Sequence, residues 1–162
     1  MAIKSKKFYF FIMLGIVALD QASKWLVVKY IPLESTVNLV KGFFRFWHVR
    51  NSGAIWGFFQ GHSNKLIPVA ITVLAIAALL IVSYFFLRTP GSYRLELTAY
   101  TLILGGALGN IIDRLRLGYV IDFLDMFVKS WHWPTYNVAD SCITIGVLLL
   151  ALSMWRGKCI QY

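Results

Sequence analysis

Four long hydrophobic runs divide this chain, and polar residues collect between them. A transmembrane helix needs about 20 consecutive, mostly apolar residues. Each of the four runs is close to that length. We therefore expect four transmembrane helices, at about 8–28, 66–87, 95–112 and 139–155.

The first run follows a basic N-terminus and so resembles a signal peptide. It is too long for the apolar region of a signal peptide, however, and it contains Asp20, Gln21 and Lys24. We therefore interpret it as a retained transmembrane helix. Asp20 and Lys24 are four residues apart, so they share one helix face and can pair.

The polar connection over 30–65 carries a strand signal at 42–50, where aromatic and β-branched residues partly alternate with polar ones. A small sheet or hairpin on the membrane surface fits this pattern. The third run contains Gly105, Gly106 and Gly109, which permit close approach of a neighbouring helix. The sequence thus predicts an all-α integral membrane protein of one domain, 1–162, with a small β-rich region in its outer-face loops.

Composition supports a lipid environment: 59% of the residues are hydrophobic and 14% are charged, against about a quarter charged in a soluble domain. The net charge of +9 could suggest nucleic acid. The basic residues flank the apolar runs, however, and no nucleic-acid-binding motif is present. We expect no nucleic-acid partner.

Charge also predicts orientation. The short segments 1–7, 88–95 and 156–162 carry seven basic residues and no acidic one. Short basic loops remain on the cytoplasmic side of a membrane. We expect both termini in the cytoplasm, and the long polar connections on the outer side.

Four of the seven acidic residues lie in the stretch 109–140, beside apolar runs where charge is costly. Structural roles explain three of them. Asn137 and Asp140 fit a helix N-cap with an acid at its third position. Asp113 can pair with the adjacent Arg114, and Asp125 is expected to be a solvated residue on an amphipathic surface segment.

Asp122 is harder to explain, because it sits among large apolar residues without a local cap. It is eighteen residues from Asp140, so the two can meet only through tertiary folding. Two carboxylates in contact push their proton affinities apart. One could then take a proton from an attacking water while the other protonates a peptide carbonyl. The sequence leaves open which aspartate has which role.

Other catalytic groups are not arranged for chemistry. His48, His62 and His132 are scattered and form no His-Glu-x-x-His zinc motif. Neither Ser52 nor Ser141 lies in a Gly-x-Ser-x-Gly turn. We expect no metal and no cofactor. The alternative function is a component of a proton-coupled transporter, although that would predict polar residues at the middle of several helices.

Five short motifs together resemble the bacterial lipoprotein signal peptidases, the type II signal peptidases. The resemblance covers nearly the whole chain. The motifs are Leu-Asp-Gln-Ala-Ser-Lys at 19–24, Asn-Ser-Gly-Ala-Ile-Trp-Gly at 51–57, Gly-Asn-Ile-Ile-Asp-Arg at 109–114, Val-Ile-Asp-Phe at 120–123 and Asn-Val-Ala-Asp-Ser at 137–141.

The resemblance implies an aspartic endopeptidase of the bacterial inner membrane whose active site faces the outer, periplasmic side. Its substrates would be prolipoproteins that carry diacylglycerol on the lipobox cysteine, cut before that cysteine. It would be inhibited by globomycin-type cyclic peptides, and we expect it to act as a monomer. The resemblance makes Asp122 and Asp140 catalytic, and gives supporting or substrate-binding roles to Asp20, Asn51, Gly53, Asn110, Arg114 and Asn137.

One departure from the family pattern is Ile55-Trp56, where the family commonly has a small residue and then Phe. This outer loop could cover the acyl chains of the substrate. Truncating Trp56 or Phe58 is then expected to raise the Michaelis constant more than it lowers turnover.

Overall fold

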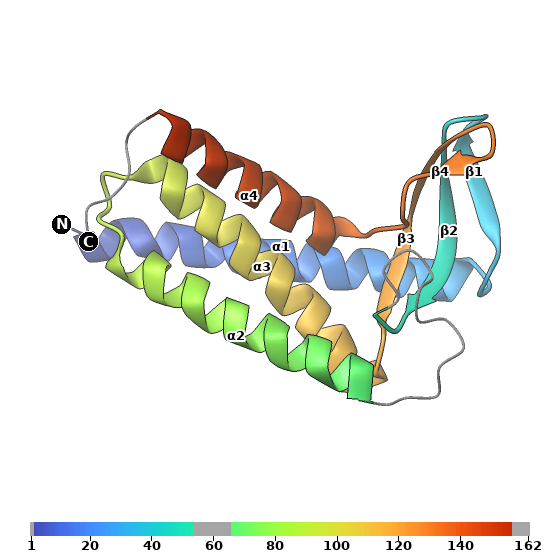
Figure 1. Ribbon diagram of the computed structural model, residues 1–162, viewed down its shortest axis with the longest axis horizontal. Helices are drawn as coiled ribbons and strands as arrows, with labels where there is room; N and C mark the ends of the chain where they lie inside the picture. Colours follow the sequence, from blue (N-terminus) through green and yellow to red (C-terminus); the bar gives the residue numbers. More distant parts are fainter. Residues whose placement is uncertain (1, 54–65, 157–162) are drawn as a thin grey trace.

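The computed structural model describes residues 2–53 and 66–156. Ile55, Trp56 and Phe58 therefore lie outside the described residues, as does His62. Four helices in the described part are long and apolar enough to cross a membrane, which confirms the predicted fold class. They are α1 (Ala2–Tyr30), α2 (Leu66–Arg88), α3 (Arg94–Leu117) and α4 (Val138–Trp155), shown in Figure 1.

Helix α3 lies at the centre of the bundle and packs against the other three helices. Its glycines permit this packing, as the sequence predicted. A Cβ atom on Gly109 would lie 2.5 Å from Asp20 Oδ2, and one on Gly105 would lie 3.0 Å from Ile16 Cβ. The helix continues past the predicted end at 112, so Asp113 and Arg114 belong to its last turns.

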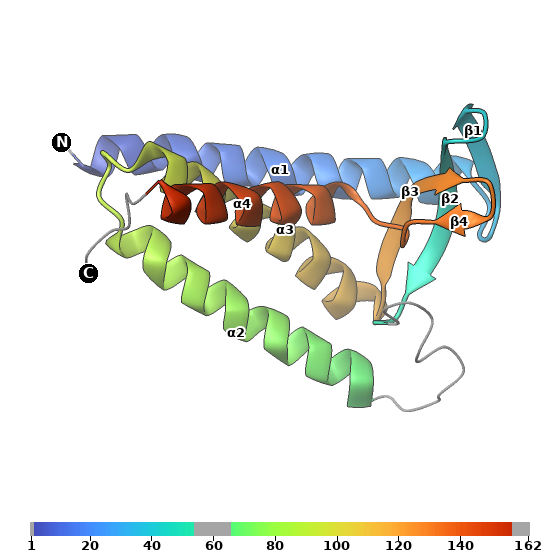
Figure 2. The same cartoon turned by 45° about the horizontal axis from the view of Figure 1, so that its top comes forward.

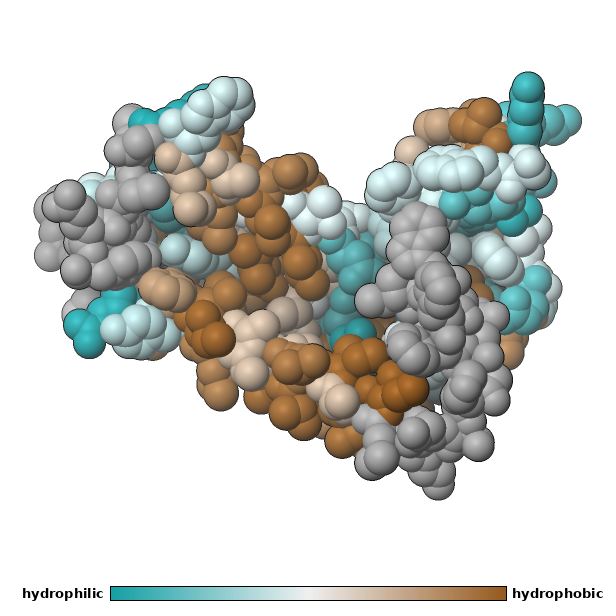
Figure 3. Space-filling view, in the orientation of Figure 1, coloured by the Kyte–Doolittle hydropathy of each residue, from teal (hydrophilic) through white to brown (hydrophobic). Residues whose placement is uncertain are grey.

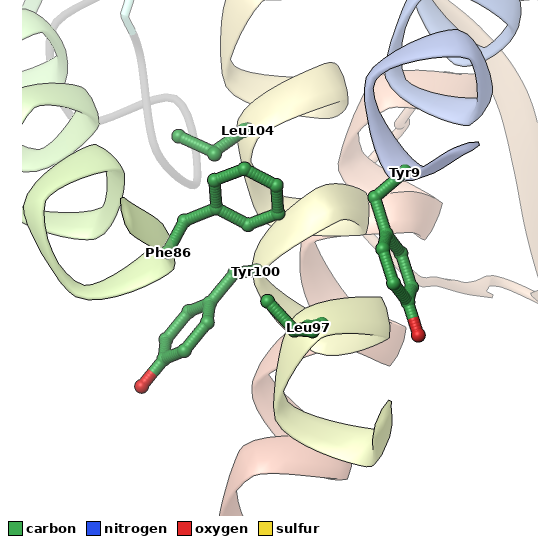
Figure 4. Close-up of a cluster of buried hydrophobic side chains, with 5 residues drawn as sticks. All are labelled: Tyr9, Phe86, Leu97, Tyr100 and Leu104. Carbon is green, nitrogen blue, oxygen red and sulfur yellow. The ribbon is translucent and has the colours of Figure 1, made fainter. Parts of the chain in front are cut away.

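Apolar side chains fill the bundle away from the sheet and also cover its outside. Tyr9, Phe86, Leu97, Tyr100 and Leu104 form a buried cluster contributed by α1, α2 and α3 (Figure 4). The outward faces of the helices are apolar as well, as the brown surface in Figure 3 shows. Such a surface is stable only where lipid replaces water. The protein is a membrane protein.

A four-stranded antiparallel sheet lies across one end of the bundle, opposite the start of α1 and the end of α4 (Figures 1 and 2). The strand predicted at 42–50 is confirmed as β2. Strand β3 was not predicted, because its apolar residues do not alternate with polar ones. In spatial order the strands are β1 (Thr36–Val40), β2 (Phe44–Asn51), β3 (Val120–Val128) and β4 (Trp131–His132).

Helix α1 connects the sheet to the bundle. Its 29 residues make a helix of about 44 Å at 1.5 Å per residue, longer than a hydrocarbon core of about 30 Å. Val27 near its end and Ile31 just beyond it pack against Phe123 of β3. The sheet is therefore anchored on the projecting end of α1.

The expectation that Asp125 is solvated is wrong. Its side chain is fully buried, 2.6 Å from Arg45 Nε and 3.0 Å from His132 Nδ1. Arg45 lies on β2, directly opposite Asp125 in the antiparallel register. Because a buried carboxylate is stable only when it is paired, Asp125 acts as a structural link across the sheet.

Candidate active site

Asp122 lies on β3, where that strand passes the end of the bundle, and its side chain is 1% exposed. The antiparallel register of β2 and β3 brings the end of β2 beside it. Asn51 Nδ2 donates to Asp122 Oδ2 at 2.9 Å. Asn51 Oδ1 in turn accepts from the backbone N–H of Gly53, whose φ of +102° is one that glycine adopts readily. Gly53 therefore helps to orient Asn51.

Asp140 lies in the first turn of α4, as the third residue of that helix. The predicted capping arrangement is confirmed: Asn137 Oδ1 accepts from Asp140 N at 2.9 Å, and Asp140 Oδ2 accepts from Asn137 N at 3.2 Å. The other oxygen, Oδ1, accepts from Asn110 Nδ2 at 2.7 Å. Asp140 thus takes part in the capping box of α4, and it also accepts a hydrogen bond from the Asn110 side chain that capping does not need.

Two carboxamides connect the aspartates. Asn137 Nδ2 donates to Asp122 Oδ1 at 2.8 Å and lies 3.1 Å from Asn110 Oδ1. Asn110 then donates from its own nitrogen to Asp140. The structure therefore brings Asp122, Asp140, Asn110, Asn137 and Asn51 into one hydrogen-bonded group, in which the two aspartates are connected through asparagine side chains.

The environment of Asp122 favours its protonated form. Burial, and after it the negative charge of Asp140, together raise the pKa of Asp122 to about 7, although the hydrogen bonds from Asn51 and Asn137 act in the opposite direction. A carboxyl group with this pKa holds a proton in a substantial fraction of molecules at neutral pH. It is suited to donate that proton to a substrate.

A buried lysine, Lys24 of α1, connects α1 to α3 next to the candidate catalytic residues. Lys24 Nζ lies 2.8 Å from Asp20 Oδ2 and 2.9 Å from Asp113 Oδ2, and it donates to Asn110 Oδ1 at 3.0 Å. The predicted pair of Asp20 and Lys24 is confirmed. Asp113, by contrast, pairs with Lys24 and not with Arg114, because α3 continues and turns Asp113 towards α1.

Each of the two carboxylates on Lys24 holds a backbone group next to a candidate catalytic residue. Asp20 Oδ1 accepts from the N–H of Ala139, and Asp113 Oδ2 accepts from the N–H of Ile121. Gln21 closes the network by donating to Asp113 Oδ1 at 2.9 Å. Sequence reasoning did not place Lys24, Gln21 or Asp113 in the site. A lysine inside a transmembrane run was the signal that could have identified the first of them.

Arg114 is half-buried at the edge of this group. Its Nη1 lies 3.5 Å from the carbonyl oxygen of Asn110, and its positive charge interacts with Asp140 and Asp122. Within residues 2–53 and 66–156 no three His, Cys, Asp or Glu side chains are grouped to hold a metal ion. Two carboxyl groups in this arrangement can exchange protons with a bound molecule.

Known proteins share this fold and sequence. Residues 12–156 match the family described as Signal peptidase (SPase) II. A lipoprotein signal peptidase of Geobacter sulfurreducens is 43% identical over 91% of both chains, and one of Desulforapulum autotrophicum is 39% identical over 88% of both. These names give the transporter alternative no support.

Two solved structures, each described as a bacterial membrane enzyme, match with TM-scores of 0.81 and 0.79. They are 28% and 30% identical to this chain and cover 94% and 91% of it; the match spans 90% and 92% of the solved chains. The chain thus has the fold of a multi-helix membrane enzyme. It belongs to the signal peptidase II family, a family of proteases.

Proposed function

We propose that this protein is an aspartic endopeptidase that removes signal peptides from prolipoproteins. Its substrates carry diacylglycerol on the lipobox cysteine, and the cut falls before that cysteine. The observation that carries the proposal is the arrangement of buried Asp122 and partly buried Asp140, whose carboxyl groups are held by a linked pair of asparagines, Asn137 and Asn110. The family relationship supports the peptidase activity.

The surroundings of the two aspartates favour different roles. Asp140 lies at the N-terminus of α4, where the helix dipole favours a negative charge. It is therefore the general base. Asp122, whose pKa is raised to about 7 by burial and by Asp140, is the general acid.

The reaction needs only these two groups and water. Asp140 accepts a proton from a water molecule while the water oxygen bonds to the carbonyl carbon, and Asp122 donates its proton to the carbonyl oxygen. In the second step the C–N bond breaks, Asp140 protonates the departing nitrogen, and Asp122 takes back a proton from the tetrahedral intermediate. Both carboxyl groups end in their starting states.

The other predicted site residues have supporting roles in this proposal. Asn51 and Asn137 hold the Asp122 carboxyl group in one orientation, and Asn110 does the same for Asp140. Asp20 fixes the backbone next to Asp140 through Ala139. Arg114, which is half-buried at the edge of the group, supplies positive charge beside the dyad and can contact the substrate backbone.

The proposal includes a bacterial inner-membrane location with both termini in the cytoplasm. Basic residues flank the start of α1, the connection between α2 and α3, and the end of α4. The two aspartates belong to β3 and to the first turn of α4, elements that lie at the other end of the bundle (Figure 2). In this proposal the active site faces the periplasmic side, where a lipid-anchored substrate presents its cleavage site. Globomycin-type cyclic peptides would inhibit the protein by occupying this site. All residues of the proposed site belong to one chain, so a monomer would be sufficient for activity.

The direct test is to incubate the purified protein with a diacylglyceryl-modified prolipoprotein and to determine the products by mass spectrometry. The proposal predicts two products, with the modified cysteine at the N-terminus of the larger one. An unmodified precursor serves as the matched control and is expected to be a poor substrate. Cleavage at another bond, or equal cleavage of both precursors, would contradict the proposal.

A further inference from the structure

A cavity of about 450 Å³ opens beside Asp140, between the β3–β4 hairpin and the first turns of α4. In Figure 3 the molecule is hollowed between the sheet and the helical bundle. Phe127 and Val128 of β3 form one wall, and Ile145 of α4 forms part of the other. Trp131 and Trp133 line its outer side and are each more than half exposed.

The cavity follows α4 from the active site into the bilayer. Asp140 and Ile145 are the first and last lining residues on that helix, and five residues correspond to about 7.5 Å along the axis. Ile145 is half exposed on the lipid-facing side. The exposed tryptophans mark the level of the headgroups, where such side chains concentrate. A molecule in the cavity would therefore reach from the headgroup level into the hydrocarbon.

The dimensions exclude a helical segment of the substrate. A helix with its side chains is about 10–12 Å wide and rises 5.4 Å per turn. A cavity of about 450 Å³ would hold only about one such turn. The helical part of a signal peptide must therefore lie elsewhere.

The polar groups of the lining argue against an extended peptide as well. An extended backbone in a water-poor site needs donors and acceptors for its own N–H and C=O groups. Here the Ser141 hydroxyl donates to the Asn137 carbonyl, and the Tyr136 hydroxyl donates to Met126 Sδ. Asp140 belongs to the active site itself, and most of the remaining lining is aromatic or aliphatic. A hydrocarbon chain needs no such partners.

We infer that this cavity, between the β3–β4 hairpin and α4, binds the proximal part of one acyl chain of the substrate's diacylglyceryl group. This inference rests on the proposed function. According to this inference, the acyl chain lies along α4, and the signal peptide extends from Asp122 and Asp140 in a different direction. Because the cavity ends at Ile145, only the first part of the acyl chain is held by protein, and the rest continues into the bilayer.

The test compares lipobox peptides that carry either dipalmitoylglyceryl cysteine or dibutyrylglyceryl cysteine, whose four-carbon chains are too short to reach Ile145 at the far end of the cavity. The Ile145→Trp variant narrows the cavity. Its matched control is Leu148→Trp, on the same helix, exposed to lipid and outside the lining. For Ile145→Trp we expect the Michaelis constant for the dipalmitoyl peptide to rise about tenfold, as for a loss of about two buried methylene groups. In the same variant, the turnover of both peptides and the Michaelis constant for the dibutyryl peptide should change less than about twofold. The Leu148→Trp control should have the wild-type turnover and Michaelis constant for both peptides.

Two results would overturn the inference. An equal rise for both peptides would mean that the cavity binds a peptide segment. No change for either peptide would mean that nothing occupies the cavity during cleavage. Failure of the wild-type protein to cleave the dipalmitoyl peptide would instead count against the proposed function, so the two failures are distinguishable.

Discussion

Asn137 Nδ2 lies 2.8 Å from Asp122 Oδ1, although Asn137 is also the residue that caps α4 and holds Asp140. One side chain thus sets the positions of both carboxyl groups. Its oxygen serves the helix that carries Asp140, and its nitrogen serves the strand that carries Asp122. Capping and catalysis can be separated experimentally because they use different atoms of this side chain.

Replacing Asn137 with serine tests that separation. Serine caps helices about as well as asparagine, but its hydroxyl is too short to bridge to Asp122. We expect Asn137→Ser to retain its thermal transition within a few degrees and to lose about 100-fold in turnover, the scale of one or two hydrogen bonds to charged groups. Asn137→Ala, which also loses the cap, should be less stable by about 1 kcal/mol. If Asn137→Ser kept both the thermal transition and the turnover of the wild type, the hydrogen bond from Asn137 to Asp122 would have no catalytic role.

The pH dependence of cleavage tests the role of Asp122. Its pKa, raised to about 7 by burial and by the charge of Asp140, lies well above the ordinary value of 3.8. If protonated Asp122 is the acid, kcat/KM should fall about tenfold per pH unit above pH 7. A rate that stays constant between pH 6 and pH 9 would contradict the assignment.

The same shift predicts a change in stability with pH. The folded state holds the Asp122 proton more tightly than the unfolded state, so ionisation of this group in the folded state is unfavourable. Its contribution to stability is therefore fully present below about pH 4, and it is lost as the pH rises towards about 7. When thermal transitions are measured at a series of pH values, the Asp122→Asn variant should lack this part of the dependence on pH. An unchanged dependence would show that the pKa of Asp122 is not raised.

Removing the charge of Lys24 should destabilise the folded protein at the active site. Lys24→Met leaves two buried carboxylates, Asp20 and Asp113, without their cation. Breaking a buried ion pair in this way costs about 3–5 kcal/mol, which lowers the transition of a protein of this size by roughly 10 °C. The Lys24→Met/Asp113→Asn double variant should recover part of that loss because one uncompensated charge is gone. Additive losses would mean that the two residues are not coupled.

The contact between α3 and α4 tests whether the position of Asp140 depends on close helix packing. A Cβ atom on Gly106 would collide with the Ala139 carbonyl oxygen, a backbone atom beside Asp140 that has little freedom to move. We expect Gly106→Ala to lower both turnover and the thermal transition. Gly15→Ala is the matched control: its Cβ meets nothing within 4 Å, so it should stabilise α1 by up to about 1 kcal/mol. If Gly106→Ala and Gly15→Ala had the same turnover and the same thermal transition, close packing of α3 against α4 would not determine the position of Asp140.

Local patterns in the sequence were sufficient to predict part of the fold and part of the candidate site. The pair of Asp20 and Lys24 follows from their spacing on one helix, and the capping of α4 by Asn137 follows from its distance to Asp140. The four helices follow from the lengths of the apolar runs. Each of these features depends on residues that are close in the chain.

Features that depend on distant residues could not be predicted. Asn51 reaches Asp122 only because β2 and β3 pair in a particular register, and β3 itself lacks the alternation that marks a strand. Asp125 looked solvated because its partner Arg45 is 80 residues away. The cavity beside Asp140 likewise needs a hairpin and a helix to come together, so no single segment indicates it.

The most direct test of the central claim is the turnover of a diacylglyceryl-modified prolipoprotein by wild type and by the Asp122→Asn and Asp140→Asn variants. Asp125→Asn is the matched control, because Asp125 is an equally buried aspartate on the same strand as Asp122 but is bonded to Arg45 and His132. Thermal transitions in detergent would establish that each variant is folded. We predict that the first two variants stay folded and lose at least about 1000-fold in turnover, whereas folded Asp125→Asn keeps turnover within about tenfold of wild type. Near-normal turnover by either Asp122→Asn or Asp140→Asn would show that the two aspartates are not the catalytic pair.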